Sequence, residues 1–219
     1  MATTLHLILD APSPSFTFIG PLNFSWVPHP APRWYGGILM APEGTNATLS
    51  ASFEVSFEGK LYFSFPVEGL SNANLGTSIT FTGNTPDPTG PQSIMVSIDD
   101  GVPYQTSYMD PTPQTYIQWY QSPTLSDDNH TIRVDRIFGA SLDYATITVG
   151  QNTPLSGKKI IVDDDDSAVH YSGNWTRNKD FFFPGLGISK GLPFQNSTHR
   201  STTPGDTVTF LFSGQPFTV

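Results

Sequence analysis

Residues 160–175 read IIVDDDDSAVHYSGNW, and this stretch repeats the beginning of the chain. The stretch Leu7–Asp10 (LILD) corresponds to Ile160–Asp163 (IIVD), which lies 153 positions later (163 − 10). With the same offset, the apolar positions and the glycine that follow in the first copy fall on Val169, Tyr171 and Gly173. A repeat at such a spacing indicates one structural unit followed by the start of another.

The repeat divides the chain into a complete first unit, a linker and part of a second unit. We expect these to span residues 1–150, 151–159 and 160–219. Near the C-terminus, Phe212-Ser213-Gly214 matches Phe57-Glu58-Gly59, now 155 positions later (212 − 57). Because the last residues, TVTFLFSGQPFTV, stop inside an expected strand, we expect the second unit to be incomplete and the chain to be a fragment.

The composition favours many short strands joined by turns. The 219 residues include 19 Gly and 20 Pro, and 13% are aromatic while only 13% are charged. The formal net charge of −9 makes nucleic acid or an anionic membrane surface an unfavourable partner. Cysteine is absent, which excludes disulfides, thiolate nucleophiles and cysteine-ligated metals.

Apolar and polar residues alternate in several segments, which is typical of strands with one buried face. Residues 47–57 and 61–67 are expected to form a hairpin through Glu58-Gly59. The alternating segments predict this core: Leu49, Phe53, Val55, Phe57, Ile94, Val96, Ile98, Ile132 and Val134. Pro28, Pro30 and Pro32 predict an extended loop, and residues 178–203 a long one.

Five segments have the N-glycosylation pattern, which favours a secreted or cell-surface protein. They begin at Asn23, Asn46, Asn129, Asn174 and Asn196. The first ten residues lack the basic and apolar regions of a signal peptide, and no apolar run reaches the roughly 20 residues that a membrane span needs. We therefore expect a leader, and any membrane attachment, to belong to segments outside this chain.

Aromatic residues gather in two expected loops, where they could stack on the apolar face of a sugar ring while polar neighbours bond its hydroxyl groups. The proline-rich loop and the loop after residue 101 supply the candidate carbohydrate-binding residues Trp26, Arg33, Trp34, Tyr35, Tyr104 and Tyr108. The alternative is that these side chains close the open end of a β-sandwich.

Acidic residues offer a weaker metal candidate, and no motif of catalysis is present. Asp163 and Asp164 begin a run of four carboxylates, which suits Ca²⁺ but equally a solvated turn. The chain has no GxSxG, HExxH or glycine-rich phosphate loop, and its histidines are not spaced as a metal pair. No cofactor is expected apart from a structural Ca²⁺.

Several motifs resemble those of galactose-binding-like β-sandwich modules. In the second copy they are Asp163-Asp164, Val169–Trp175 and Thr203–Asp206. In the first copy they are Ile94–Gly101 (IMVSIDDG), Ser122–Asp127 (SPTLSD), His130-Thr131-Ile132 and Ser141–Tyr144 (SLDY). The chain is most similar in these features to the tandem extracellular modules of mushroom-forming fungi, many of which precede a membrane span.

The resemblance implies an all-β, antiparallel jelly-roll-like sandwich followed by an incomplete second copy. It also implies a structural Ca²⁺ near acidic loops. For function we expect a non-catalytic extracellular module that binds a glycan or cell-wall polysaccharide through loop aromatics. The alternatives are a purely structural or adhesive repeat of a fungal surface protein, and an accessory domain of a glycoside-active enzyme.

Overall fold

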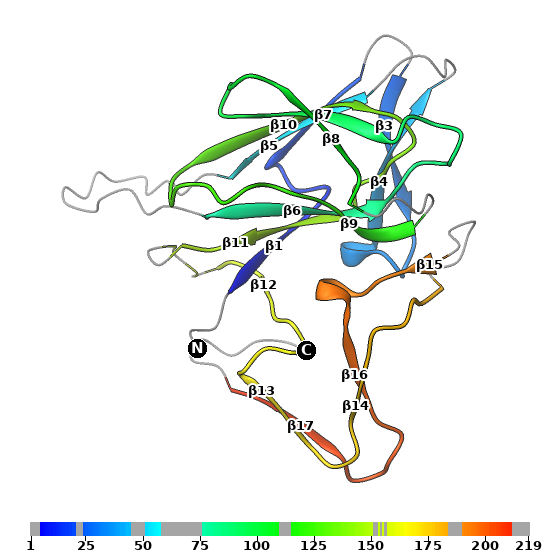
Figure 1. Ribbon diagram of the computed structural model, residues 1–219, viewed down its shortest axis with the longest axis vertical. Helices are drawn as coiled ribbons and strands as arrows, with labels where there is room; N and C mark the ends of the chain where they lie inside the picture. Colours follow the sequence, from blue (N-terminus) through cyan, green and yellow to red (C-terminus); the bar gives the residue numbers. More distant parts are fainter. Residues whose placement is uncertain are drawn as a thin grey trace, which may run out of the picture.

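The fold is known from a computed structural model, which describes residues 5–20, 24–44, 51–57, 76–109, 115–150, 153, 155, 157–183 and 190–211. Strands make up most of these residues, and the only helical segments are two single turns at Tyr35–Gly37 and Phe194–Asn196. Figure 1 shows two stacked sheets and, below them in this view, two short two-stranded ribbons formed by residues 169–210. The predicted all-β, antiparallel jelly-roll-like sandwich is confirmed, with one parallel strand pair at its edge.

A six-stranded sheet forms one layer of the sandwich. Its strands in spatial order are β12 (Ile160–Ile161), β1 (His6–Asp10), β11 (Tyr144–Thr148), β6 (Ser78–Asn84), β9 (Thr115–Gln121) and β15 (Lys190–Gly191). All neighbours are antiparallel except β15 and β9. Both edge strands, β12 and β15, come from the second half of the chain.

A five-stranded antiparallel sheet forms the other layer. Its strands in spatial order are β2 (Phe16–Ile19), β5 (Ala51–Phe57), β10 (His130–Ile137), β7 (Ser93–Ile98) and β8 (Tyr104–Ser107). β5 alternates between buried and half-buried residues along its whole length, as its sequence predicts.

The core lies between the two layers. Phe53 and Val55 of β5 and Ile132 of β10 meet Phe81 of β6 and Trp119 of β9 from the opposite sheet, and all five side chains are buried. The predicted core residues Phe57, Ile94, Val96 and Val134 are likewise buried, and Ile98 is partly buried against them. Leu49 and the predicted strand at 61–67 lie outside the described residues.

Two predicted loops are wrong. Residues 24–30 do not form a loop but strand β3 (Phe24–Pro30), which pairs with β4 (Ile38–Gly44) in a separate two-stranded ribbon. A two-stranded ribbon tolerates proline because each strand has one free edge, where the missing N–H costs nothing. Within residues 178–203, strands β15 and β16 (Thr198–Arg200) and the turn at Phe194–Asn196 form instead of one long loop.

Residues 160–211 belong to the predicted second copy, a name that we keep for them, and one of their strand pairings matches a pairing of the first copy. β13 (Val169–Ser172) pairs with β17 (Thr207–Phe210), and β14 (Thr176–Asn178) pairs with β16. In the first copy Phe16 is paired with Val55. The corresponding residues of the second copy, Val169 (153 positions after Phe16) and Phe210 (155 positions after Val55), are paired with each other as well. Phe210 is exposed, however, whereas Val55 is buried. The division of the chain into units at 150 and 160 stays a prediction.

Candidate functional site

The loop between β3 and β4 lies against the outer face of the six-stranded sheet. The inner face of that sheet is identified by Leu7, Ile117 and Ala145, which belong to the main core. Because side chains of a strand alternate between faces, the next positions point outward. At these positions Ile8, Tyr116 and Tyr144 form a second buried cluster with Trp34 of the loop and Leu39 of β4.

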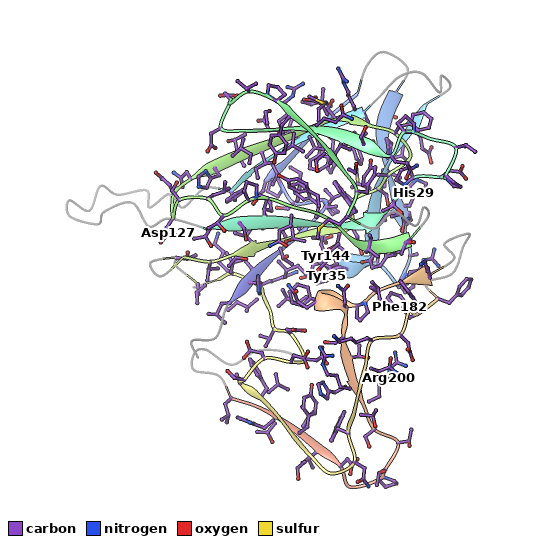
Figure 2. All side chains as sticks on the ribbon, in the orientation of Figure 1. His29, Tyr35, Asp127, Tyr144, Phe182 and Arg200 are labelled. Atoms are coloured by element: carbon purple, nitrogen blue, oxygen red, sulfur yellow. The ribbon has the colours of Figure 1, made fainter. Side chains whose placement is uncertain are left out.

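Trp34 is the centre of this second cluster. The ring of Trp34 stacks on the ring of Tyr116 with centroids 5.6 Å apart. The guanidinium of Arg33 lies 4.6 Å from the centroid of the Trp34 ring. Only 7% of Trp34 is exposed, so the loop uses this side chain to attach itself to the sheet. Tyr35, the next residue, is half-buried with its edge against Tyr144; Figure 2 labels both side chains.

Asp143 is a fully buried carboxylate beneath this loop. One of its oxygens, Oδ2, accepts hydrogen bonds from the hydroxyl of Tyr116 at 2.5 Å and from the backbone N–H of Tyr35 at 3.2 Å. Burial raises the pKa of Asp143 to about 7; these two bonds lower the pKa and the nearby charge of Asp10 raises it. Burial also raises the pKa of Tyr116 well above its ordinary value, so this hydroxyl remains a donor.

Asp10, at the end of β1, is the second carboxylate of the site. Burial raises its pKa, while a bond from the backbone of Ala11 and the charge of Lys159 lower it. Oδ1 of Asp10 and Oδ1 of Asp143 are both buried, and neither has a hydrogen-bond partner among the described residues. Ca²⁺ requires six to eight oxygen ligands, but the groups that contact Asp143 Oδ2 are donors. The pair therefore suits a retained proton better than a Ca²⁺ ion.

Gly36 allows the loop to approach Asp10 closely. Its φ of +63° lies in the left-handed region, and a Cβ there would overlap the Asp10 carboxylate. Gly36→Ala should therefore lower the free energy of unfolding by about 1–2 kcal/mol through backbone strain and displacement of Asp10. Urea denaturation measures this loss. Gly157→Ala, at φ +71° with open space around the Cβ, is the control for backbone strain alone; an equal loss there would contradict a role for Asp10.

A row of rings continues from this cluster to the surface. Tyr116 contacts Phe182 edge-on at 6.2 Å, and Lys190 Nζ lies 4.0 Å from the ring centroid of Phe181. Phe181, Phe182 and Phe183 are all exposed, and Figure 2 shows Phe182 near the junction of the sandwich with the lower ribbons. We name Arg33, Phe181, Phe182 and Phe183, which are exposed, together with the half-buried Lys190 the aromatic–cationic row.

The other aromatic candidates lie elsewhere. Trp26, in β3 rather than in a loop, donates its Nε1–H to the carbonyl of Ser52 at 2.8 Å and packs against the core. Tyr104, in β8, is exposed, with its hydroxyl 3.0 Å from that of Tyr120. Tyr108 is buried with its edge against Trp119. The structure thus brings together Arg33, Trp34 and Tyr35 but not the remaining three.

The glycosylation candidates that can be located are on the surface. Asn129, Asn174 and Asn196 are exposed, whereas Asn23 and Asn46 lie outside the described residues. A glycan at any of the three would therefore project into solvent. Their modification stays a prediction.

The metal candidates Asp163 and Asp164 lie in the turn before β13. Burial and the neighbouring Asp164 and Asp165 raise the pKa of Asp163 to about 6. Asp164 Oδ2 is bonded to Nδ1 of His199, which sequence analysis missed because this residue is 35 positions away. Asp10, Asp143, Tyr116 and Phe182 were missed for the same reason. One signal was available: Asp143 is a lone acid followed by an apolar strand.

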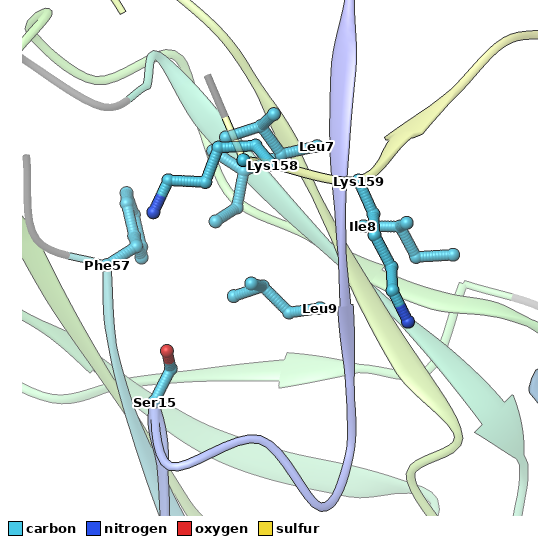
Figure 3. Close-up of a pocket in the computed structure, with 9 residues that line it drawn as sticks. Leu7, Ile8, Leu9, Ser15, Phe57, Lys158 and Lys159 are labelled. Atoms are coloured by element: carbon cyan, nitrogen blue, oxygen red, sulfur yellow. The ribbon is translucent and has the colours of Figure 1, made fainter. Parts of the chain in front are cut away.

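A small pocket lies at the other side of β1, between the sandwich and residues 157–159. Its volume is about 190 Å³, and Leu7, Leu9, Phe57 and Ile147 form much of its wall, as Figure 3 shows for the labelled residues. Ligand sites usually measure roughly 300–1,000 Å³. We therefore do not assign a ligand to this pocket.

Among the described residues there is no helix long and apolar enough to cross a membrane.

Comparison with known proteins finds similarity among solved structures. No family model matches the chain, and no curated protein matches its sequence. A family 11 carbohydrate-binding module from Clostridium thermocellum, solved in complex with a β-1,3-1,4-mixed-linked tetrasaccharide, is 13% identical and aligns over 68% of this chain and 98% of its own, with a TM-score of 0.32. A likeness of this strength does not bear on the ligand of this chain.

Proposed function

We propose that this chain is a non-catalytic, extracellular glycan-binding module. The observation that carries the proposal is the aromatic–cationic row: exposed phenylalanine rings, with Lys190 against Phe181 and Arg33 against Trp34, on a protein with a net charge of −9. A sugar presents an apolar C–H face that can stack on such rings, and its hydroxyl groups can accept hydrogen bonds from the two cations. The five glycosylation patterns support the extracellular setting.

We infer that exposed neighbours of Trp34, and not Trp34 itself, would contact the sugar. Because Trp34 is buried between Arg33 and Tyr116, its replacement would damage the loop, and a loss of binding would be ambiguous. Phe182 and Arg33 are exposed and can be removed with little effect on the core. They are therefore the residues to test.

We expect Phe182→Ala and Arg33→Ala to weaken binding to a retained glycan by about tenfold each, which corresponds to roughly 1.4 kcal/mol. A glycan array identifies the ligand, and calorimetry with it measures the change. Phe210→Ala is the matched control, because Phe210 is 38% exposed against 37% for Phe182 but lies on β17. The proposed surface is contradicted if the glycan binds both variants as tightly as the unchanged chain. It is also contradicted if Phe210→Ala weakens glycan binding as much as they do.

One observation favours a second candidate, a structural or adhesive repeat. Trp34 and Tyr108 are buried and Trp26 is bonded to the backbone, so three of the five predicted binding aromatics serve packing. A purely structural module would retain no glycan on the array. That result would decide for the second candidate and against the first.

A further inference from the structure

Two carboxylates and a histidine from distant parts of the chain meet in the second copy. Asp164 and Asp165 belong to the turn before β13, and His199 is the central residue of β16. One ligand atom from each lies within 4.8 Å of those of the other two. Asp164 Oδ2 is 2.6 Å and Asp165 Oδ1 4.0 Å from Nδ1 of His199.

Neighbouring groups hold these three side chains in place. Ser197, which is buried, donates its hydroxyl to Asp164 Oδ1 at 2.8 Å and lies 3.1 Å from Asp165 Oδ2. Arg177 donates to both oxygens of Asp165. The ring of His199 stacks on Tyr171 with centroids 4.1 Å apart. Outer groups that orient ligating carboxylates and histidines in this way are a regular part of metal sites.

The acidic turn contains more negative charge than its described partners balance. Among the described residues, its ion pairs are those of Asp165 with Arg177 and of Asp164 and Asp165 with His199. Asp163 has in addition a buried Oδ1 with no hydrogen-bond partner. Four consecutive carboxylates against one arginine and one histidine leave a negative excess that a divalent cation would offset.

We propose that Asp164, Asp165 and His199 bind a zinc ion. The histidine nitrogen decides the metal, because Ca²⁺ and Mg²⁺ prefer oxygen ligands, whereas zinc accepts nitrogen and carboxylate together. His199 would coordinate through Nδ1 and keep its proton on Nε2. The histidine–carboxylate pair of the first copy, His130 with Asp99, has no second carboxylate in contact among the described residues and is not such a site.

The ion would act as a staple between the acidic turn and β16. The ribbons of the second copy leave Val208, Phe210 and Leu211 exposed, so they bury little apolar surface of their own. Small units with an insufficient core are commonly stabilised by a metal. The bound ion would thus join the acidic turn to β16 and add stability that the small apolar core of the second copy does not provide.

Zinc chloride titrated into the metal-free full chain by calorimetry tests the proposal. We expect one zinc per chain, bound at least about tenfold more tightly than calcium chloride, and a loss of about tenfold or more in His199→Gln and in Asp164→Asn. His170→Gln, which changes an exposed histidine of β13, should bind zinc as the unchanged chain does. The absence of saturable 1:1 binding, equal affinity in His199→Gln, or preference for calcium would overturn the site.

A measurement on the unchanged protein covers the case in which a variant does not fold. Saturation with zinc should shift the NMR signals of the His199 ring and leave those of His29 and His170 in place. A shift of the other rings in place of His199 would overturn the proposal. Because no glycan takes part, the outcome is independent of the proposed function.

Discussion

Replacing Phe53 with alanine is expected to lower the free energy of unfolding by about 3–5 kcal/mol. Phe53 is fully buried and joins the two layers. Its ring centroid lies 5.1 Å from that of Phe81 and 6.4 Å from that of Trp119, both in the opposite sheet. It also contacts the ring of Trp26 at 5.8 Å. The substitution therefore leaves a cavity that strands from three sheets would have to close.

Urea denaturation followed by tryptophan fluorescence measures this effect. Val102→Ala, at a position that is 91% exposed, should change the free energy by no more than about 0.5 kcal/mol. A loss below about 1 kcal/mol in Phe53→Ala would mean that the centre of the sandwich is packed otherwise than described.

The fold is expected to lose stability as the pH rises from about 4 to about 7, because of Asp143. The pKa of an aspartate is about 3.9 in the unfolded chain, whereas burial raises the pKa of Asp143 to about 7 in the fold. Between these values the folded state binds a proton that the unfolded state has released, so the free energy of unfolding falls with rising pH. One group shifted by about three units contributes up to roughly 4 kcal/mol over this range.

Asp143→Asn isolates this contribution. The amide can accept the bonds from Tyr116 and Tyr35 and carries no charge, so it imitates the protonated acid. We expect the variant to have a flatter pH profile than the unchanged chain and to be the more stable of the two at pH 8. His130, whose pKa is raised, changes stability in the same direction but is present in both proteins. Equal slopes in the two proteins would contradict the assignment.

The sandwich was predictable where a strand has one buried face. Phe53, Val55, Ile94 and Val134 alternate with polar residues, and alternation is fixed locally by the geometry of a strand. The ribbon of β3 and β4 was not predictable in this way, because Pro28 and Pro30 exclude a central strand but not a strand with a free edge.

The candidate site was predictable only in part. The loop that contains Arg33, Trp34 and Tyr35 was identified from its aromatic residues, but its packing against Tyr116 depends on which face of a distant sheet it meets. Asp143 and Asp10 are 133 positions apart (143 − 10), and neither forms part of a local motif. Contacts of this kind are set by topology, which alternation and composition do not specify.

The joint between the two copies has a mechanical consequence. β12 extends the sheet of the first copy through only two residue pairs with β1, whereas β1 and β11 share five. Under tension along the chain, a strand held by two residue pairs separates at a lower force than one held by five. β15, the other strand that the second copy adds to this sheet, also has only two pairs, with β9. A stretched protein would therefore separate at β12 and β15 before β1 leaves β11.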